Sequence, residues 1–364
     1  MTKVWDVIVI GGGQAGMASG YYLKKNELQF LILEASGQVG GSWPFYYDSL
    51  KLFSPASLSS LPGMKIAAES THYPLRNEVI QYLNDYAKSF HLPIRLNQKV
   101  MTIEKNEEGF EVRTGTGDVY LARTIINASG SFHSPYTPEI KGRDLFQGEV
   151  LHSSLYRNVE PFKDQRVVVV GRGNSAVQIA VELADSSHTT LAVLKPVAFV
   201  KQKVLGIDLH YWLRGTGLDT FPFWRLDKKA PAPTAAADLG EYKIKLALGK
   251  PDQRQMFSSF NNEGVIWSDG KREKVDTIIF ATGYRLSLPF LRPLGALDKD
   301  GKPIQTAGVS LTVPGLYFVG LEGQRSFASA TLRGVGPDAK FVISKLIKHL
   351  KSVKKSMNMG RNLP

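Results

Sequence analysis

Short apolar runs alternate with amphipathic helical patterns along this chain of 364 residues. The run VWDVIVI ends in a glycine-rich turn, and apolar positions at helical spacing follow through Met17, Tyr21 and Leu23. A second apolar run covers residues 30–33. Strands that alternate with helices in this way are typical of βαβ units built around a parallel sheet. The pattern therefore predicts an α/β protein.

The same pattern begins again 160 residues later. It predicts a strand at residues 167–170, a helix that runs to about Asp185, and a strand at residues 190–194. A last helix is expected from about Pro337. Three further apolar runs end in small residues, which suit the close passage of another backbone: 124–130, 276–284 and 315–320.

Two such units in a chain of this length indicate two domains. The first unit needs the C-terminal strand and helix to be complete, so the second unit should be inserted into the first. We expect two Rossmann-like domains, with residues 1–150 plus 276–364 in the first and 151–275 in the second. An insertion at about 201–257 holds aromatic groups and a Pro/Ala run, KKAPAPTAAAD, expected to be an exposed loop. This insertion could shape a substrate path or an oligomer contact.

The first glycine loop has the full dinucleotide fingerprint. Gly11 permits the tight turn, Gly13 lets the backbone approach a pyrophosphate, and Gly16 allows close packing of helix and strand. Glu34, at the end of the second strand, is placed to accept hydrogen bonds from ribose hydroxyls. A ligand-free turn would explain the glycines but not this acid. The expected dinucleotide-binding residues here are Gly11, Gly13, Gln14, Ala15, Gly16, Glu34 and Ala35.

The second glycine loop reads Gly171-x-Gly173-x-x-Ala176. No acid ends its second strand, where Lys195 stands instead. A lysine attracts the 2′-phosphate that an acid would repel, so this loop is expected to prefer NADPH over NADH. The alternative is that Lys195 only faces solvent at a strand end. Arg172, inside the loop, could likewise add charge near the phosphates or point to water. Asn174 and Ser175 open the helix that follows and join the expected nucleotide-binding set.

Composition removes several classes of function. The chain is 43% apolar and 21% charged, as in ordinary globular proteins, and it contains no cysteine. Disulfides, thiolate metal sites and dithiol chemistry are therefore excluded, and the seven scattered histidines give no metal-ligand spacing. Half of the net charge of +12 lies in residues 345–364, which are expected to form a solvated helix rather than a nucleic-acid or membrane contact. With no leader and no apolar span, a cytoplasmic protein is expected.

Between the two glycine loops lies Phe146-x-Gly148-x-x-x-His152-x-x-x-Tyr156. It is similar to the FxGxxxHxxxY/F sequence that identifies flavin-containing monooxygenases, the class B flavoprotein monooxygenases. The stretches GNSA at 173–176 and GGSW at 40–43 also resemble that family. The resemblance extends over nearly the full chain, is weakest at about 201–257, and is greatest to small bacterial members. It implies FAD in the first site and NADPH in the second, with NADH accepted by some members.

The resemblance also implies an activity. A C4a-hydroperoxyflavin would transfer oxygen to a soft nucleophile, such as a thioether sulfur or an amine nitrogen, with ketones as an open question. Larger family members carry an Asn near the flavin edge, and spacing places Phe53 at that position. Phe cannot hydrogen-bond an oxygenated flavin, so coupling to substrate is in doubt. The alternative is a flavin-dependent NAD(P)H dehydrogenase or electron-transfer reductase without productive oxygenation.

Several further residues receive expected roles from the resemblance. Asn174 could bridge nicotinamide and flavin, Ser54 could donate a hydrogen bond, and His152 could bind the nicotinamide nucleotide. Trp43, Phe53 and Tyr211 could line the site, with core packing as the alternative for each. The expected partners are O2 and a small-molecule substrate, with a homodimer as the assembly. The remaining cofactor-binding candidates are Gly41, Ser42, Leu52, Ser129, Gly130, Ala281, Thr282, Gly283 and Gly320.

Overall fold

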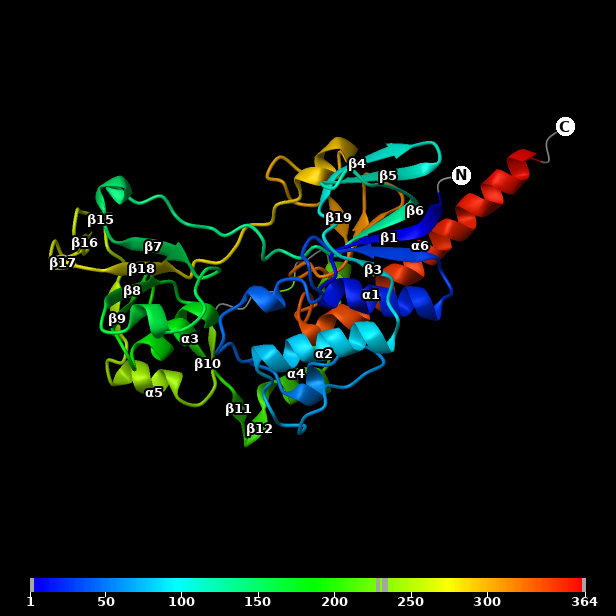
Figure 1. Cartoon of the computed structure of the whole chain (residues 1–364). Coiled ribbons are helices and arrows are strands. Elements are labelled where there is room, and N and C mark those ends of the chain that lie inside the picture. Colours follow the sequence, from blue (N-terminus) through cyan, green and yellow to red (C-terminus); the bar gives the residue numbers. More distant parts are fainter. Residues whose placement is uncertain (1–2, 227–229, 231–234, 362–364) are drawn as a thin grey trace.

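A computed structural model describes residues 3–226, 230 and 235–361 of the chain. It has two lobes joined by extended segments, and the C-terminal helix projects from the lobe that also holds the N-terminus (Figure 1). Each lobe is built on a β-sheet flanked by helices: a nine-stranded mixed sheet with a parallel centre in the first lobe, and a five-stranded parallel sheet in the second. The α/β class and the two Rossmann-like units predicted from the sequence are confirmed.

The first sheet contains both glycine-loop strands of the first unit and the C-terminal strand. β1 (Val4–Ile10) lies in its centre, between β2 (Phe30–Leu33) and β6 (Val119–Asn127), and both neighbours run parallel to it. β21 (Leu316–Phe318) pairs in parallel with β6, as the insertion hypothesis requires. The other strands of this sheet are β3 (Ile94–Arg95), β4 (Val100–Asn106), β5 (Gly109–Thr114), β19 (Gln305–Thr306) and β20 (Val309–Ser310).

The second sheet has the order β14-β9-β8-β18-β7 and is parallel throughout. Val-rich β8 is buried on both faces, as expected of a strand between helix layers. β18 pairs with β8, and β7 pairs with β18, so both strands belong to the second sheet. The domain boundaries expected at residues 150 and 276 therefore differ from the sheet, because they place residues 149–150 of β7 and all of β18 in the first domain. The bounds are β7 (Glu149–His152), β8 (Arg166–Val170), β9 (His188–Val193), β14 (Asp252–Gln255) and β18 (Thr277–Phe280).

Helices cover the sheets with their apolar faces. The cores hold buried aliphatic side chains of the central strands together with the helix residues that face them. The last helix begins five residues earlier than expected and holds Pro337 in its second turn. No helix among the described residues is long and apolar enough to cross a bilayer. The helices are α1 (Gln14–Lys25), α2 (Arg76–Ser89), α3 (Asn174–Leu183), α4 (Leu209–Gly215), α5 (Tyr242–Ala247) and α6 (Leu332–Arg361).

Part of the insertion, at residues 202–219, contacts the first lobe, whereas its last strand, β14, stays in the second sheet. The α4 segment lies below α2 in the view of Figure 1, and Arg333 Nε at the start of α6 donates to both carboxylate oxygens of Asp219 at 3.0 Å. Most of the expected Pro/Ala loop, residues 227–229 and 231–234, lies outside the described residues. The short strands of this region and of the loop after it are β10 (Phe199–Lys201), β11 (Lys203–Val204), β12 (Ile207–Asp208), β13 (Ala236–Asp238), β15 (Ser259–Phe260), β16 (Gly264–Ile266) and β17 (Arg272–Lys274).

Candidate functional site

The first glycine loop joins the carboxyl end of β1 to the N-terminus of α1. A Cβ atom at Gly16 would lie 1.9 Å from the carbonyl oxygen of Gly11, so only glycine lets helix and strand approach this closely. The free amides and the partial positive charge of the helix N-terminus face the same edge of the sheet. Gln14 and Ala15 occupy the first turn of α1, where the fingerprint requires them.

Glu34 follows β2 and reaches back to this loop. Its side chain is buried, and Oε2 accepts from the backbone N–H of Gly12 at 2.6 Å. Oε1 accepts from the N–H and the hydroxyl of Ser36, each at 2.9 Å. The carboxylate is therefore held at the mouth of the loop, and Oε2, which accepts one hydrogen bond, keeps a second lone pair for a ribose hydroxyl. Ala35 beside it is exposed.

The GGSW stretch packs directly over the glycine loop. Trp43 Nε1 donates to Gln14 Oε1 at 3.0 Å, and Gln14 Nε2 donates to the carbonyl of Ala330 at 2.6 Å. Trp43 also packs on the core beneath, as the packing alternative for this residue expects. Gly41 and Ser42 precede it, with Gly41 in the left-handed region at φ 59°. The loop, the GGSW stretch and the start of α6 therefore form one hydrogen-bonded unit.

The strands β6 and β21 end at the same edge of the sheet. β6 ends in Asn127, a candidate site residue that sequence reasoning missed. Asn127 is 1% exposed, and its Oδ1 accepts from the hydroxyl of Ser129 at 2.9 Å. Among the described residues, nothing accepts a hydrogen bond from its Nδ2. A buried donor left without an acceptor is costly, and a ligand oxygen at this edge would satisfy it. The strands predicted through Gly130 and Gly320 end earlier, which leaves these glycines in the loops at this edge.

These features fit a dinucleotide cofactor in the first lobe. The set offers helix-terminal amides for phosphates, a fixed carboxylate for a ribose, and an unsatisfied amide donor for a polar ring or sugar atom. The parallel strands β1, β2, β6 and β21 bring all of them to one carboxyl edge. This is the edge at which ligands bind in open α/β sheets.

The second glycine loop occupies the equivalent edge of the second sheet. No heavy atom lies within 4 Å of a Cβ built on Gly173, so the loop has an open face there. Arg172 and Lys195 are both exposed, and they follow the neighbouring parallel strands β8 and β9. Asn174 Oδ1 accepts from the backbone N–H of Ala237 at 2.8 Å, which leaves its amide nitrogen for another partner. Ser175 follows it in α3. The loop therefore presents free amides and two cations together.

His152 ends β7 and contacts the segment that follows β18. The backbone N–H of Ser154 donates to His152 Nδ1 at 3.1 Å, so the proton of the neutral ring is on Nε2. Nε2 then donates to the carbonyl of Gly283 at 2.9 Å, and Tyr284 packs edge-on against the ring. Burial lowers the pKa of His152 below its usual range. Both ring nitrogens are thus hydrogen-bonded to protein groups, and neither is left free for a nucleotide.

Gly283 also joins the two extended segments that connect the lobes. Its carbonyl oxygen accepts from the backbone N–H of Tyr136 at 3.0 Å, and the hydroxyl of Thr282 donates to the carbonyl of Tyr136. The strand expected to continue through Ala281 ends at Phe280, so residues 281–283 form the return crossing itself. In Figure 1 the two crossings run between the lobes along the upper side. His152 therefore fixes the position of this crossing.

The other residues of the identifying stretch are structural. A Cβ at Gly148 would lie 2.3 Å from the ring of Phe146 and 2.5 Å from the carbonyl oxygen of Asp276. Phe146 and Tyr156 are buried, and the hydroxyl of Tyr156 donates to Glu182 at 3.1 Å. The stretch thus seals one edge of the second sheet against α3 and the crossing.

Residues 47–54 connect the two glycine loops. Near the start of this segment, the hydroxyl of Tyr47 donates to Gln178 of α3 at 2.8 Å. Near its end, Leu52 belongs to the core cluster that also contains Ala15 of α1. Ser54 is buried and its hydroxyl pairs with that of Ser59 at 2.8 Å. The segment therefore spans from the helix of the second loop to the helix of the first.

Phe53 meets the insertion at this place. Its carbonyl oxygen accepts from Gln202 Nε2 at 2.8 Å, and its ring stacks on His210 with centroids 6.0 Å apart. His210 pairs with Asp208 at 2.9 Å, and sequence reasoning missed both residues. The spacing Asp-x-His in DLH was the available signal. Tyr211 faces away, with its hydroxyl on that of Ser57 at 2.6 Å.

Comparison with known proteins agrees with this geometry. Residues 8–222 match the family described as pyridine nucleotide-disulphide oxidoreductase. A flavin-containing monooxygenase from Stenotrophomonas maltophilia has 30% sequence identity and a TM-score of 0.83, with 96% of this chain and 100% of that chain covered. The chain belongs to the flavin monooxygenases of this family.

Two relatives extend the comparison. An uncharacterized oxidoreductase CzcO-like of Geobacillus kaustophilus is 35% identical over 96% of this chain and 100% of its own length. The indole-3-pyruvate monooxygenase YUCCA4 of Oryza sativa subsp. japonica is 27% identical over 96% of this chain and 89% of its own length. The resemblance stated from the motifs is thus confirmed. As a flavin monooxygenase, the enzyme is an oxidoreductase that uses a flavin and a pyridine nucleotide.

The matching family is named for disulfide chemistry, but this monooxygenase lacks the cysteines that such chemistry requires. It has no cysteine anywhere in its sequence, so no thiol can exchange with a disulfide. Within residues 3–226, 230 and 235–361, no group of three or more His, Asp or Glu side chains could hold a metal ion.

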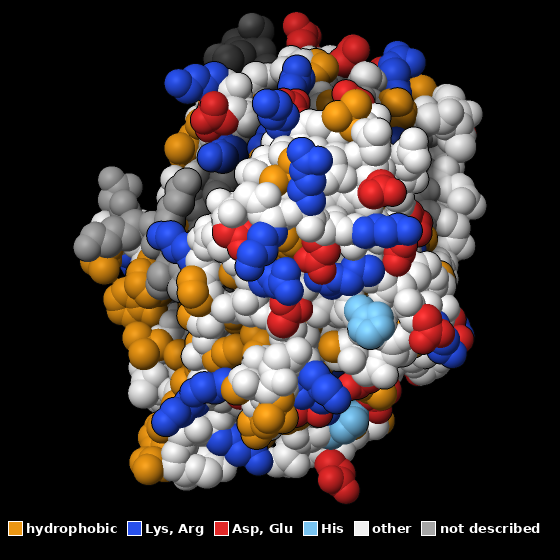
Figure 2. Space-filling model, turned by 90° about the vertical axis from the view of Figure 1, so that its left-hand side faces the viewer, with side chains coloured by type: hydrophobic (Ala, Val, Ile, Leu, Met, Phe, Trp, Pro, Cys, Tyr) orange, Lys and Arg blue, Asp and Glu red, His pale blue; other side chains and the backbone are white. Residues whose placement is uncertain are grey.

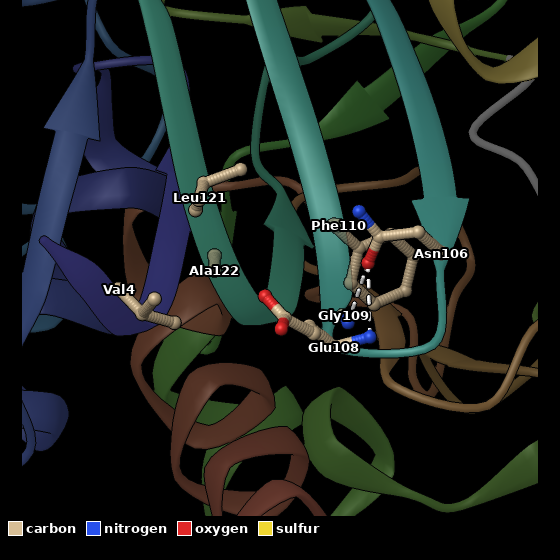
Figure 3. Close-up of a pocket in the computed structure, with 7 residues that line it drawn as sticks. All are labelled: Val4, Asn106, Glu108, Gly109, Phe110, Leu121 and Ala122. Atoms are coloured by element: carbon tan, nitrogen blue, oxygen red, sulfur yellow. Dashed lines mark hydrogen bonds between the residues drawn. The ribbon is translucent and has the colours of Figure 1, made fainter. Parts of the chain in front are cut away.

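A shallow hollow at the turn between β4 and β5 is not the site of this monooxygenase. Figure 3 shows Asn106 closing the turn, with its side-chain oxygen accepting from the backbone N–H of Glu108 and of Gly109 at 3.0 Å. Val4, which also lines the hollow, begins β1. The hollow thus lies at the amino edge of the sheet, opposite the glycine loop. Ligands of open α/β sheets bind at the carboxyl edge.

The outer end of the second lobe shows no large field of one charge. Figure 2 shows Lys and Arg side chains intermixed with Asp and Glu over this face. Part of this mixture is a network in which Glu273 accepts from Arg166 at 2.7 Å and from Arg254 at 3.0 Å. Burial opposes the ionisation of Glu273, but these partners outweigh it and lower its pKa. The network ties β17 to β8 and β14.

Proposed function

We propose that this protein is an FAD-containing, NADPH-dependent monooxygenase that oxygenates thioether sulfur and amine nitrogen, and that it also accepts NADH. The observation that carries the proposal is the segment 47–54, which joins the helix of one dinucleotide loop to the helix of the other. A hydride donor in the second site and a flavin in the first would meet along this segment. Oxygen transfer requires such a point, because the flavin must first receive hydride from the nicotinamide nucleotide.

FAD is favoured over a smaller flavin by the first loop. Only a dinucleotide flavin offers both a pyrophosphate for the amides of α1 and an adenosine ribose for Glu34. When bound, it would accept hydride from the nicotinamide nucleotide and activate O2 for transfer to the substrate. Gln14 and Trp43, which hydrogen-bond each other, would form one wall at that position. Their hydrogen bond fixes the indole and helps to keep water out.

NADPH is favoured by the charge at the second loop. Arg172 and Lys195 are exposed on neighbouring parallel strands, where an adenosine 2′-phosphate would lie. Their flexible side chains can also leave the site, which permits NADH to bind with lower affinity. The free amide nitrogen of Asn174 would reach toward the nicotinamide from the start of α3.

The substrate proposed is a soft nucleophile of the thioether or amine class. Phe53 and Trp43 would give the pocket apolar walls. Such walls suit neutral organic sulfur and nitrogen compounds. Ketones form a second substrate class to test, because apolar walls would also suit a neutral carbonyl compound.

A second candidate function is an NAD(P)H dehydrogenase or electron-transfer reductase that releases hydrogen peroxide. Phe53 favours it, because a phenyl ring offers no hydrogen bond at the position where larger family members carry an Asn. The two functions differ in the fate of O2. One atom appears in the organic product of a monooxygenase, and neither atom does so with a reductase.

The test uses the purified full-length protein with its native flavin. The flavin is released and identified, and the enzyme is then supplied with NADPH, ¹⁸O2 and a methyl aryl thioether. The proposal expects one ¹⁸O atom in the sulfoxide and NADPH consumed in comparable amount. Consumption of NADPH with peroxide alone would establish the reductase instead. Parallel runs with NADH, a tertiary amine and a cyclic ketone define the donor and substrate preference.

We also propose that the enzyme is a cytoplasmic homodimer. The insertion exposes large apolar side chains on β11, β12 and α4, which would suit a contact with a second copy: Leu205, Ile207 and Trp212. Light scattering coupled to size exclusion tests the assembly, and a monomer at micromolar concentration contradicts it. Fractionation of the source cells tests the compartment.

A further inference from the structure

Asp208 and His210 form a buried pair at the start of α4. Both side chains are almost fully enclosed, with 6% and 8% of their area exposed. Asp208 Oδ1 accepts from the backbone N–H of His210 at 2.8 Å and lies 2.9 Å from His210 Nδ1. The carboxylate thus caps the helix and grips the imidazole with the same oxygen.

The other carboxylate oxygen of Asp208 also accepts two hydrogen bonds. Asp208 Oδ2 accepts from the hydroxyl of Tyr73 and from Gln202 Nε2, the latter at 2.6 Å. Burial opposes ionisation of Asp208, but the hydrogen bonds from His210, Tyr73 and Gln202 outweigh it and lower its pKa to about 2. Asp208 is therefore a carboxylate at neutral pH and can only accept hydrogen bonds.

The ionised acceptor fixes the chemistry of the ring. Because Asp208 offers no proton, the proton of neutral His210 must be on Nδ1, where it is donated to Oδ1. The lone pair is then on Nε2, which has no hydrogen-bond partner among the described residues. A carboxylate behind an imidazole makes the far nitrogen a better base and stabilises the imidazolium. His210 can therefore take up and return a proton at Nε2.

The position of the pair suggests which reaction it serves. His210 stacks on Phe53, with an interplanar angle of 30°, and Gln202 joins Asp208 to the carbonyl of Phe53. Phe53 belongs to the segment 47–54 that runs between the two dinucleotide loops. The ion pair between Asp219 and Arg333 fastens the same insertion to the first turn of α6. The pair is thus held at the proposed meeting point of the cofactors.

Oxygen transfer needs a proton at this point. For each turnover, hydride from the nicotinamide nucleotide supplies two electrons, and O2 is split between the substrate and water. The sum is NADPH, H⁺, O2 and thioether giving NADP⁺, sulfoxide and water. The proton comes from solvent, and no charged side chain described at the first glycine loop could carry it except the Glu34 carboxylate, which is held by Gly12 and Ser36.

We propose that His210, oriented by Asp208, is the residue that delivers this proton at the site of oxygen transfer. The inference rests on the proposed monooxygenase function. His210 would act as the proton-exchanging group, and Asp208, Tyr73 and Gln202 as the residues that position it. Larger family members carry an Asn at the position of Phe53, and its side chain could donate a hydrogen bond. Proton delivery by His210 would take over part of that role.

Few other titratable groups face the pair. Tyr73 donates to Asp208, and burial followed by the neighbouring carboxylate raises its pKa to about 12, so it stays neutral. Lys51 lies over the ring of Tyr73 at 5.8 Å. Tyr211, next in α4, bonds to Ser57 and not to the pair. Of these residues, His210 is therefore the one with a ring nitrogen, Nε2, left to exchange a proton.

The experiment compares the full-length, flavin-bound enzyme with His210→Gln, which cannot carry a proton, and with Asp208→Asn. His133→Gln serves as the matched control, because His133 is an exposed histidine on the crossing whose Nε2 contacts the carbonyl of Ser287. Stopped-flow mixing separates reduction of the flavin by NADPH from the later reaction with O2 and thioether. Flavin content and melting temperature are measured for every variant.

We expect His210→Gln to reduce flavin at the normal rate but to form sulfoxide on the order of 100-fold more slowly. The pH dependence and the solvent deuterium effect of the oxygen step should disappear with it, which a structural role would not cause. Sulfoxide formation at an unchanged rate and with an unchanged pH profile would overturn the inference while leaving the proposed function intact. Peroxide without sulfoxide from the unaltered enzyme would contradict the proposed function and the inference with it.

A spectroscopic measurement keeps the inference testable even if a variant fails to fold. In the unaltered, flavin-bound protein labelled with ¹⁵N-histidine, long-range ¹⁵N–¹H spectra report the protonated ring nitrogen of His210. The inference requires Nδ1–H in the neutral ring and a titration that responds to NADP⁺ binding. A ring protonated on Nε2 would contradict it.

Discussion

His152 Nε2 donates a hydrogen bond to the carbonyl oxygen of Gly283 across 2.9 Å, and this bond joins the end of β7 to the chain that returns from β18 to the first lobe. The stretch that identifies flavin-containing monooxygenases therefore acts on the connection between the lobes. The same carbonyl accepts from Tyr136 on the outgoing segment, so a single oxygen holds both crossings together.

Removal of this hydrogen bond should change how the second lobe meets the flavin. We expect His152→Ala to retain FAD, because the first glycine loop is untouched, and to lower the rate of flavin reduction by NADPH about tenfold. Loss of a buried donor costs about 1–3 kcal/mol, which is enough for such an effect. Anaerobic stopped-flow reduction measures it, with His133→Ala as control. FAD loss with a normal reduction rate would contradict the interpretation.

His152 should also make stability depend on pH. Burial lowers its pKa in the folded protein below the usual 6.5, so the unfolded chain binds more protons at acidic pH. Its contribution to the free energy of unfolding is therefore present above about pH 6.5 and is lost as the pH falls through the folded pKa. Urea unfolding at pH 8 and pH 5 measures this loss. It should be smaller in His152→Gln than in the unaltered protein, and unchanged in His133→Gln.

Lys195 should set the preference between nicotinamide nucleotides. Replacement by Ala removes a cation at the proposed 2′-phosphate position, and a hydrogen bond to a charged group contributes about 1.5–3 kcal/mol. We expect the KM for NADPH to rise at least about tenfold and the KM for NADH to stay constant. Lys271→Ala, at the turn before β17, is the matched surface control. An unchanged KM for both nucleotides would show that Lys195 only faces solvent, and an equal rise for both would contradict a contact with the 2′-phosphate.

Phe53 should limit coupling between NADPH consumption and product. Phe53→Asn adds a hydrogen-bond donor at the proposed flavin edge, and one net hydrogen bond is worth about 1 kcal/mol. The ratio of sulfoxide to hydrogen peroxide should then rise about fivefold. Phe53→Leu removes the same ring without adding a donor and should not raise the ratio. A gain of similar size in both variants would point to added space in the pocket instead.

The ion pair between Arg333 and Asp219 should hold the insertion to the first lobe. Both side chains are about 95% buried. Arg333→Met leaves a buried carboxylate without its partner and should lower the free energy of unfolding by about 3–5 kcal/mol. The double variant with Asp219→Asn should recover part of this loss. Lys163→Met breaks an exposed pair with Glu160 and should change stability by less than about 1 kcal/mol.

Much of the cofactor site could be predicted from the sequence. Glycine spacing, the apolar strands and Glu34 are local patterns, and each follows from the need of a parallel strand, a tight turn and a helix to follow one another within about 30 residues. Because parallel strands end at one edge, these patterns also determined that both loops lie on carboxyl edges. The absence of cysteine excluded disulfide chemistry by composition alone.

The domain boundaries were predicted less accurately than the glycine loops. No strand was predicted at β7, and the strand predicted at 276–284 was expected in the first domain. Only the pairing of β18 with β8 and of β7 with β18 assigns both strands to the second lobe. The glycines expected to end β6 and β21 lie in loops, because backbone pairing stops at Asn127 and Phe318.

The contacts that relate the two cofactor sites were decided by tertiary structure alone. His152 meets Gly283 across 131 residues, Tyr47 meets Gln178 across the same separation, and Gln202 meets Phe53 across 149. Asn127 becomes an unsatisfied donor and Asp208 a carboxylate beside a base only when distant segments enclose them. Periodicity and motif spacing report what neighbours in the chain require of each other. The sequence by itself therefore determined the two glycine loops and the family, which implies a flavin and a pyridine nucleotide. The fold decided which side chains lie between the two loops.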